Sequence, residues 1–403
     1  MRLCDLSPAH IRAISPYQPG KPIAELAREM GLAESSIVKL ASNENPLGFG
    51  DKARAAMAAA LDDLARYPDG NGFELKQALC RRYGVAMDEI VLGNGSNDVL
   101  ELAARAFLGP QTSAIYAQHA FAVYPLATQA VGARGVEVPA RHFGHDLDAM
   151  LAAITPDTRV LFIANPNNPT GSYLPVTELQ RLRAGLPDDV ILVIDAAYAE
   201  YADAVDYTSG LEMARSTPNT VSMRTFSKLH GLAALRLGWM TAGPGIVDVM
   251  HRVRGPFNVS LPAQAAGVAA LDDVEHAELA RAHNARWLPW LSREITALGL
   301  RVHPSQGNFI LIEFPAGAGR DAAAANAHLE AEGIIPRQMG GYGLPNCLRI
   351  SVGLEDENRR LVEALAGFYL PEGFKDIAAY VVVLVMLVVK PNGLFGGSAR
   401  KKV

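Results

Sequence analysis

The stretch from Thr225 to Trp239 contains the residues best suited to covalent chemistry. Its lysine, Lys228, directly follows Ser227, and Arg236 comes eight positions later. A lysine amine can form an imine with an aldehyde cofactor, while hydroxyls and a guanidinium can bind phosphate oxygens on that cofactor. An isolated Ser-Lys pair is more often part of a polar surface turn. The chemical interpretation therefore depends on whether the rest of the chain supplies the other parts of such a site.

Those parts occur upstream in the chain. Asp195 ends an apolar run and could keep a pyridine nitrogen protonated, which makes the ring an electron sink. Tyr198 and Asn168 could form hydrogen bonds with a phenolic oxygen on that ring. Ser96 and Asn97 follow a strand-like run and a glycine turn, where free N–H groups at a helix start favour an anion. Each residue alone has an ordinary structural explanation, but together they predict a site for a phosphate-bearing pyridine cofactor.

The elements that would position these residues alternate between strands and helices. Strand-like runs occur at residues 89–92, 113–116, 136–138, 159–164, 190–194 and 220–223, with helical segments between them. Two of these runs are almost wholly apolar, as in central parallel strands that are buried on both faces. Ligands of an open parallel sheet bind beyond the carboxyl ends of its strands, and Asn168, Asp195, Tyr198 and Lys228 all follow such ends. The sequence predicts an α/β fold with a mostly parallel central sheet between layers of helices.

A change of pattern after Pro262 predicts a second, smaller α+β domain. One long helical stretch covers residues 263–298, and strands follow near residues 308–314 and 347–352. Arg349 lies inside the last strand, where arginine is rare unless it binds a carboxylate or phosphate, and Arg337 is a second candidate. The predicted divisions are an N-terminal arm that packs with the small domain (1–45), a large cofactor-binding domain (46–262), the small domain (263–370) and an apolar tail (371–403).

Composition excludes several classes of function. The net charge is -5 with mixed signs, so there is no basic stripe for nucleic acid. The three cysteines, Cys4, Cys80 and Cys347, are widely spaced and show no metal-binding pattern, so we expect reduced thiols and no structural metal. The N-terminal residues 1–19 lack the apolar core of a signal peptide. We therefore expect a cytoplasmic enzyme.

A set of short motifs then identifies a family. They are Leu40-Ala41-Ser42-Asn43-Glu44-Asn45-Pro46, Arg66-Tyr67-Pro68, the turn 93–98, Asn167-Asn168-Pro169-Thr170-Gly171, Asp195 with Tyr198, Thr225-Phe226-Ser227-Lys228 and Leu348-Arg349-Ile350. With these motifs the chain resembles the fold-type I, pyridoxal-phosphate-dependent aminotransferases, and most closely their histidinol-phosphate branch. The resemblance covers residues 10 to about 368. It implies a two-domain homodimer with active sites at the subunit interface.

The resemblance also implies specific roles. Lys228 would carry the cofactor and move the proton, Asp195 would pair with the ring nitrogen, and Phe121 would stack on the ring where the family often has tyrosine. The other implied cofactor contacts are Asn168, Tyr198, Ser96, Asn97, Thr225, Ser227, Arg236 and, from the neighbouring subunit, Tyr67. The implied substrate contacts are Arg349, Arg337, Tyr17 and Asn43. The implied reaction is a ping-pong transfer of an amino group between glutamate or 2-oxoglutarate and the histidinol-phosphate pair.

Other interpretations share parts of this evidence. An aromatic or broad-range aminotransferase, or a pyridoxal-phosphate-dependent decarboxylase of a phosphorylated amino acid, would have the same cofactor residues and differ in the substrate pocket. A sugar- or nucleotide-binding α/β protein would not need Lys228.

The tail contains thirteen uncharged residues, 377–389, and resembles the end of a branched-chain amino-acid transporter permease. We expect it to be an appendage from a shifted or fused reading frame, with a membrane anchor, a partner-docking helix and a membrane-transport component as rival hypotheses.

Overall fold

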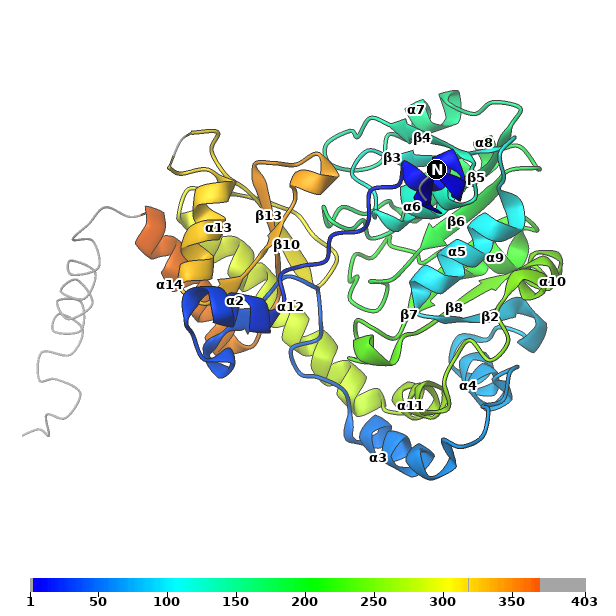
Figure 1. The fold of residues 1–403 in the computed structure, drawn as a ribbon, viewed down its shortest axis with the longest axis horizontal. Helices are drawn as coiled ribbons and strands as arrows, with labels where there is room; N and C mark the ends of the chain where they lie inside the picture. Colours follow the sequence, from blue (N-terminus) through cyan, green and yellow to red (C-terminus); the bar gives the residue numbers. More distant parts are fainter. Residues whose placement is uncertain (1–2, 318, 370–403) are drawn as a thin grey trace, which may run out of the picture.

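The computed structural model describes residues 3–317 and 319–369, which form two lobes (Figure 1). The predicted tail, residues 371–403, lies outside the described part. A seven-stranded sheet in the order β2-β8-β7-β6-β5-β3-β4 is the centre of the large lobe. Its strands are β2 (Ile90–Asn94), β3 (Ser113–Ala117), β4 (Arg134–Val138), β5 (Thr158–Ala164), β6 (Ile191–Asp195), β7 (Thr220–Thr225) and β8 (Leu237–Ala242). The prediction of a mostly parallel α/β sheet is confirmed, since only β8 runs antiparallel to its neighbours.

Helices cover both faces of this sheet because the strands are apolar on both faces. Along β5, Val160 and Phe162 belong to one core cluster, whereas Leu161 and Ile163 belong to another. Such alternation is the period-2 pattern of a strand buried on both sides. The covering helices are α3 (Asp51–Ala60), α4 (Phe73–Tyr83), α5 (Ser96–Phe107), α6 (Val123–Ala130), α7 (Leu147–Ala152), α8 (Val176–Gly185), α9 (Leu211–Ser216), α10 (Pro244–Val253) and α11 (Leu261–Leu271).

Strand β8 was not predicted, and it explains how the lysine segment is held. No strand was predicted after residues 220–223 in the large domain, but Leu237 to Trp239 begin β8, which pairs antiparallel with β7 from Thr225↔Gly238 onward. Residues 226–236 are therefore a connection between two paired strands, fixed at both ends. This connection holds Lys228 at the carboxyl end of β7.

The small lobe contains a four-stranded antiparallel sheet in the order β12-β13-β10-β9. Its strands are β9 (Arg301–His303), β10 (Phe309–Glu313), β12 (Arg337–Gln338) and β13 (Cys347–Ser351), and its helices are α12 (Val274–Ala297), α13 (Ala322–Ala331) and α14 (Glu355–Tyr369). Trp287, Leu291 and Ile295 of α12 pack with Ile310 of β10 and other residues in one core cluster. The predicted Arg349 lies in the central strand β13.

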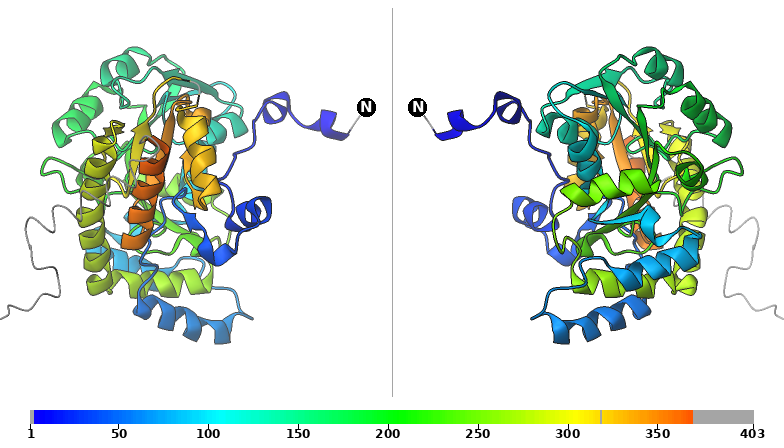
Figure 2. Two further views of the ribbon diagram at one scale, coloured as in Figure 1. Left: turned by 90° about the vertical axis from the view of Figure 1, so that its left-hand side faces the viewer. Right: turned by 90° about the vertical axis from the view of Figure 1, so that its right-hand side faces the viewer.

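The N-terminal segment joins the small lobe through a short parallel pairing. β1 (Val38–Lys39) pairs with β11 (Ile334–Ile335), and α2 (Ile23–Met30) packs beside them through Leu26. The first described residues, including α1 (Ala9–Arg12), form an arm that projects from the rest of the molecule (Figure 2).

The helical stretch after Pro262 differs from the prediction in one respect. The chain forms two helices, α11 and α12, that are separated at Asp272 and Asp273, rather than one helix over 263–298. Helix α11 packs against α3 and α4, and its Ala263 and Ala266 share a core cluster with Trp239 of the large lobe. The predicted division at residue 263 therefore falls too early for this helix, because its small side chains fit the large lobe. Helix α12 is the element that passes from one lobe to the other (Figure 1).

The described residues contain neither a membrane-spanning helix nor a metal-binding cluster. No helix among residues 3–317 and 319–369 is long and apolar enough to cross a membrane. In the same part of the chain, no group of three or more histidine, cysteine, aspartate or glutamate side chains could hold a metal ion.

Candidate active site

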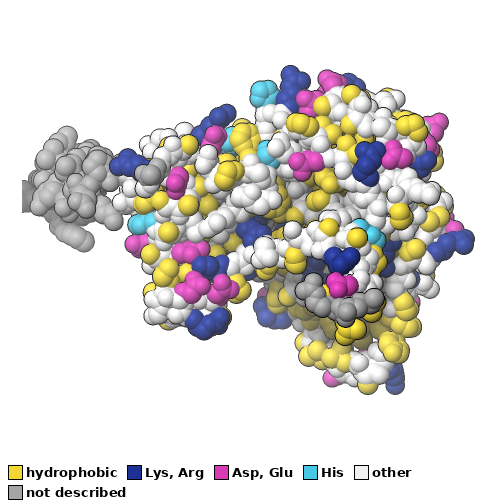
Figure 3. All heavy atoms as spheres, turned by 45° about the horizontal axis from the view of Figure 1, so that its top comes forward, with side chains coloured by type: hydrophobic (Ala, Val, Ile, Leu, Met, Phe, Trp, Pro, Cys, Tyr) yellow, Lys and Arg dark blue, Asp and Glu magenta, His cyan; other side chains and the backbone are white. Residues whose placement is uncertain are grey.

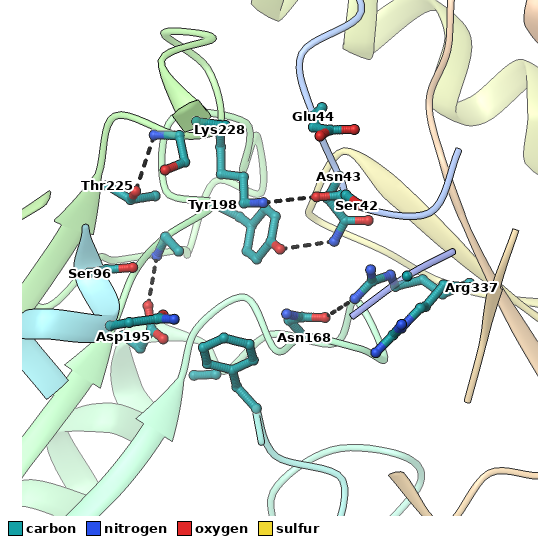
Figure 4. A pocket seen from close by; sticks show the side chains of 18 of the residues that line it. Ser42, Asn43, Glu44, Ser96, Asn168, Asp195, Tyr198, Thr225, Lys228 and Arg337 are labelled. Atoms are coloured by element: carbon teal, nitrogen blue, oxygen red, sulfur yellow. Dashed lines mark hydrogen bonds between the residues drawn. The ribbon is translucent and has the colours of Figure 1, made fainter. Parts of the chain in front are cut away.

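A cavity of about 260 Å³ between the lobes brings the predicted residues together. Figure 4 shows Lys228, Tyr198, Asn168 and Asp195 around one space, with Arg337 on the side of the small lobe. All the predicted site residues except Tyr67 line this cavity: Tyr17, Asn43, Ser96, Asn97, Phe121, Asn168, Asp195, Tyr198, Thr225, Ser227, Lys228, Arg236, Arg337 and Arg349.

The Lys228 amine lies in this cavity and is easier to deprotonate than an ordinary lysine. Its Nζ donates a hydrogen bond to the main-chain oxygen of Ser42, 3.1 Å away, and lies 5.6 Å from the centre of the Tyr198 ring. Burial, together with the positive charges of Arg349 and Arg236, lowers the pKa of Lys228 to about 8. Roughly one amine in ten is then neutral at pH 7, against well under one in a thousand for a free lysine. A neutral amine is the form that acts as a nucleophile or base.

An anion cradle forms one end of the cavity. Gly95 is the N-cap of α5 and provides no side-chain cap, so the first N–H groups of this helix are left for a ligand. A Cβ atom on Gly95 would lie 2.3 Å from Nη2 of Arg236, and one on Gly238 would lie 2.5 Å from the Ser96 nitrogen. Only glycines permit so close an approach of donors. Arg236 itself is held at a φ of 54°, an uncommon conformation for a residue other than glycine.

The carboxylate of Asp195 forms the floor of the cavity. Its Oδ2 accepts a hydrogen bond from the Tyr124 hydroxyl at 2.9 Å, and its Oδ1 accepts one from the Ala197 N–H at 3.2 Å. Burial raises the pKa of Asp195 to about 6, while these two donors and the Lys228 charge act in the opposite direction. Asp195 is therefore charged at neutral pH but would gain from a cationic N–H partner.

Tyr198 is held so that its own proton is free for a ligand. The Tyr198 oxygen accepts a hydrogen bond from Nδ2 of Asn43 at 2.9 Å. Asn43 is fixed in turn by Ser351, whose Oγ accepts from the Asn43 N–H at 2.7 Å and donates to its Oδ1 at 3.1 Å. Since the hydroxyl accepts from Asn43, it can donate to an oxygen inside the cavity.

The small lobe contributes two guanidinium groups. Arg349 is 6% exposed and donates to Asn168 Oδ1 and, at 2.6 Å, to the Ala41 oxygen, while its Nε has no hydrogen-bond partner. Arg337 donates to the Gln18 oxygen and lies over the Tyr17 ring. Within the described residues neither guanidinium forms an ion pair with an acid, so both charges are available to an anionic ligand.

Tyr67 is the one predicted residue that the structure does not bring into this cavity. It is 82% exposed and stacks on Phe257, with ring centres 4.6 Å apart, at a different surface pocket. In a single chain it therefore contacts no part of the site, and a contact in the neighbouring subunit stays a prediction.

The residues present fit pyridoxal phosphate. The uncapped start of α5 and Arg236 suit its phosphate, the buried Asp195 carboxylate suits a protonated pyridine nitrogen, and the free Tyr198 proton suits the ring oxygen. The Phe121 ring lines the same cavity and provides an apolar face. Each polar group of the cofactor thus has a complementary group of this chain.

Comparison with known proteins decides the family. The family Aminotransferase class I and II matches residues 35–365. The chain belongs to this family. The prediction of a pyridoxal-phosphate-dependent aminotransferase of fold-type I is thereby confirmed.

Three relatives illustrate how much of this aminotransferase is shared. It is 50% identical over 400 residues to histidinol-phosphate aminotransferase 2 of Nitrosospira multiformis, covering 99% of this chain and all of that protein. It is 53% identical over 364 residues to a histidinol-phosphate aminotransferase of Methylobacillus flagellatus, covering 90% and 97%. The crystal structure of the Sinorhizobium meliloti histidinol-phosphate aminotransferase in complex with pyridoxal-5'-phosphate superposes with a TM-score of 0.82 at 28% identity, over 90% of this chain and 97% of that one.

The comparisons do not support the interpretation of the tail. The alignment with the N. multiformis protein covers 99% of this aminotransferase, so it extends into residues 371–403. The likeness of this segment to a transporter permease, and the shifted or fused reading frame inferred from it, were therefore not borne out.

Among the residues at the site that the sequence analysis missed are two tyrosines. Tyr124 bonds Asp195, and Tyr342 lines the cavity from the small lobe. Tyr124 lies three positions after Phe121, so helical spacing was the one signal that both could face the same region. Tyr342 follows two glycines, which by themselves indicate only a turn.

Proposed function

We propose that this aminotransferase transfers an amino group between L-histidinol phosphate and 2-oxoglutarate, giving imidazole-acetol phosphate and L-glutamate. The names of the relatives at 50% and 53% identity support this substrate pair. The observation that carries the proposal is the surplus of cations in the cavity. Among the described residues, the lining contains four basic side chains, Lys228, Arg236, Arg337 and Arg349, and two acids, Glu44 and Asp195. One of those acids, Glu44, already pairs with Lys39.

This surplus matches two anionic groups that would be bound at once. The cradle at α5 with Arg236, Thr225 and Ser227 would hold the cofactor phosphate. Arg349 and Arg337 lie on the small lobe and would hold the second anion, which is the substrate phosphate in one half-reaction and a glutamate carboxylate in the other. Tyr17 and Asn43 would complete this subsite, since both line the cavity beside the arginines.

Lys228 would perform the proton transfers. When bound, pyridoxal phosphate supplies the aldehyde that takes up the amino group and a ring that delocalises negative charge from the substrate α-carbon. The Lys228 amine, with its pKa lowered to about 8, could accept the proton from that carbon and would deliver it to the carbon that carried the cofactor's aldehyde, which completes the transfer of the amino group. Its hydrogen bond to Ser42 orients Nζ in the cavity.

Asp195 and Tyr198 would set the charge distribution on the ring. A carboxylate buried on β6 stabilises a positive nitrogen beside it, and the Tyr198 proton stabilises negative charge on the ring oxygen. Asn168, Ser96, Asn97 and Phe121 would orient the ring from the remaining sides. These assignments are proposals that mutagenesis can test one at a time.

The active form would be a homodimer in which Tyr67 reaches the cofactor phosphate of the neighbouring subunit. Figure 3 shows hydrophobic side chains gathered on the lower part of the large lobe in that view. Exposed large hydrophobic residues of this chain include Leu61, Leu64, Tyr67 and Phe257. An apolar surface of this kind supports association with a second copy. We also propose a cytoplasmic location and the three-part division into arm, large and small domains, with the large domain extended through α11.

The substrate assignment is tested by half-reactions of the purified holoenzyme. The visible absorbance of the bound cofactor is followed after mixing with L-histidinol phosphate, L-glutamate or L-phenylalanine, one at a time. Fast loss of absorbance with the first two and slow loss with phenylalanine is the expected result. Equal or faster loss with phenylalanine would instead indicate an aromatic aminotransferase.

A further inference from the structure

We propose that Tyr124 is a positioning residue that keeps Asp195 charged and aimed at the cofactor nitrogen. The inference rests on the role proposed above for Asp195. Tyr124 lies on α6, is fully buried, and its hydroxyl donates to Oδ2 of Asp195 at 2.9 Å. It does not line the cavity, so it can act on the chemistry only through residues that do, chiefly Asp195.

The Tyr124 ring has no freedom to turn away from this contact. It stacks on the Phe162 ring, with ring centres 5.0 Å apart and an angle of 4° between the ring planes. The Phe121 ring contacts it edge to face, with 6.0 Å between the ring centres. The Tyr124 main-chain oxygen also accepts a hydrogen bond from Thr128 Oγ1 at 2.8 Å. Because the phenol is packed on two sides and tied to its own helix, its hydroxyl points to the Asp195 carboxylate, its one acceptor among the described residues.

The direction of this hydrogen bond is fixed by electrostatics. Burial and the neighbouring Asp195 charge hold the pKa of Tyr124 well above its ordinary value, so the phenol keeps its proton. It must therefore donate. A donor to a carboxylate favours the charged form of that carboxylate, and this opposes the burial that favours the neutral form.

Asp195 has few other neighbours that could stabilise its charged form in place of Tyr124. Among the described residues, the remaining groups that act on the charge of Asp195 are the Ala197 N–H and the Lys228 amine. Two more phenols lie close enough for the Asp195 charge to raise their pKa, those of Tyr198 and Tyr207. Once the cofactor is bound, Lys228 is engaged with it. The Tyr124 hydroxyl and the Ala197 N–H are then the donors that fix the orientation and the charge of the Asp195 carboxylate, one on each oxygen.

The arrangement also links two surfaces of the cofactor site. Phe121, which lines the cavity, packs against the same Tyr124 ring that holds Asp195. Tyr124 thus sets the position of the carboxylate below the ring and supports the apolar face beside it. A residue with a purely structural role would affect folding but not the proton affinity of Asp195.

The test measures cofactor affinity of the cofactor-free protein as a function of pH. Pyridoxal phosphate is titrated into the full-length protein, and Kd is obtained from absorbance at each pH. Affinity should fall as the pH drops and Asp195 becomes protonated. Tyr124→Phe keeps the ring and its packing, and we expect the midpoint of this fall to move up by about one pH unit from about 6. Kd should then be weaker by about twofold at pH 7 and by about tenfold at pH 5.

The matched control is Tyr173→Phe. Tyr173 also donates to an aspartate, Asp206, at 2.9 Å, but neither residue lines the cavity. The pH midpoint of cofactor binding in Tyr173→Phe should therefore equal that of the parent protein. Ionisations of the cofactor itself are the same in all variants and cancel. A Tyr124→Phe midpoint that equals the control would overturn the inference.

Two further variants separate the possible failures. Replacement of Tyr124 by 3-fluorotyrosine strengthens the donor without changing the fold, and the midpoint should then move down; an unchanged midpoint would contradict the inference even if the phenylalanine variant does not fold. Asp195→Asn should remove the part of the fall that is centred near pH 6 and leave the parts that come from Lys228 and from the cofactor itself. If Asp195→Asn binds the cofactor like the parent protein, the role proposed for Asp195 fails, and the inference about Tyr124 fails with it.

Discussion

Replacing Arg349 by methionine should remove the binding of both substrate anions without unfolding the protein. Arg349 is nearly fully buried on β13, and within the described chain it has no acid partner. Its partners are the amide oxygen of Asn168 and the main-chain oxygen of Ala41. Methionine matches the part of the arginine side chain up to Nε and has no charge, so it fills most of the apolar space without leaving an unpaired cation.

The expected loss follows from the contacts that the guanidinium can offer to an anion. A two-point contact provides two charge-assisted hydrogen bonds at about 1.5–2 kcal/mol each, or about 3–4 kcal/mol in total. This corresponds to a decrease of roughly 150- to 900-fold in kcat/KM. Because one arginine would serve both half-reactions, glutamate and histidinol phosphate should be affected alike.

The assay compares the rates of the two half-reactions in Arg349→Met and in Arg337→Met. Arg337 is tied to Gln18 and is more exposed, so we expect its removal to affect the phosphorylated substrate more than glutamate. Thermal unfolding of the cofactor-free variants checks the fold, and Arg349→Met should unfold at the same or a higher temperature than the parent. A decrease below about fivefold for both substrates would refute the role of Arg349 as the common anion-binding group.

Further predictions concern the other charged and interfacial residues. Lys228→Ala should lower kcat by about 1,000-fold or more while the cofactor still binds, which absorbance and steady-state rates can measure. Asp195→Asn should stabilise the cofactor-free protein. Burial raises the pKa of Asp195 from 3.8 in the unfolded chain to about 6 in the folded protein, so between these pH values the folded state binds a proton that the unfolded state has lost. The contribution of Asp195 to stability is therefore complete below about pH 4 and is lost as the pH rises through about 6. Urea unfolding should show a gain of at most about 3 kcal/mol at pH 8 and almost none at pH 4, and an equal gain at both would contradict the cause. If Tyr67 acts in the neighbouring site, mixing inactive Lys228→Ala with inactive Tyr67→Ala protein should restore one active site in each mixed dimer. Since about half of the dimers are mixed after random exchange, the average is at most half an active site per dimer. No recovery after verified subunit exchange would exclude the shared site.

The large lobe was predictable because its strands have a strong local pattern. Residues 160–164 of β5 and 191–194 of β6 are all apolar, and polar turns follow them, so both the strands and the site at their carboxyl ends could be derived. Strand β8 was missed because its residues directly follow a motif whose chemistry indicated a loop. Its pairing with β2 and β7 is a long-range property that local pattern does not contain.

The cofactor site was predicted more completely than the contacts that position it. Lys228 and Asp195 are recognisable from residue type and from their place after strands. The partners Ser351 of Asn43 and Tyr124 of Asp195 are separated from them by 308 and 71 residues, and no local signal connects such pairs. Likewise, the alanine-rich α11 has little amphipathic pattern, so the sequence did not indicate which lobe it would join.

The pairing of the first and last parts of the fold determines when the site can form during synthesis. Ala41 and Asn43 are held by Arg349 and Ser351, each 308 residues further along the chain. Closing a loop of that length costs about 5 kcal/mol in chain entropy, which isolated contacts would not offset before the lobes around them have formed. The sheet of the large lobe, whose strands end at residue 242, can form on the ribosome well before β13 has been made. The segment at Ala41–Asn43 must remain unpaired until then, so a nascent chain that stops short of Ser351 would contain Lys228 and the anion cradle but not a closed active site.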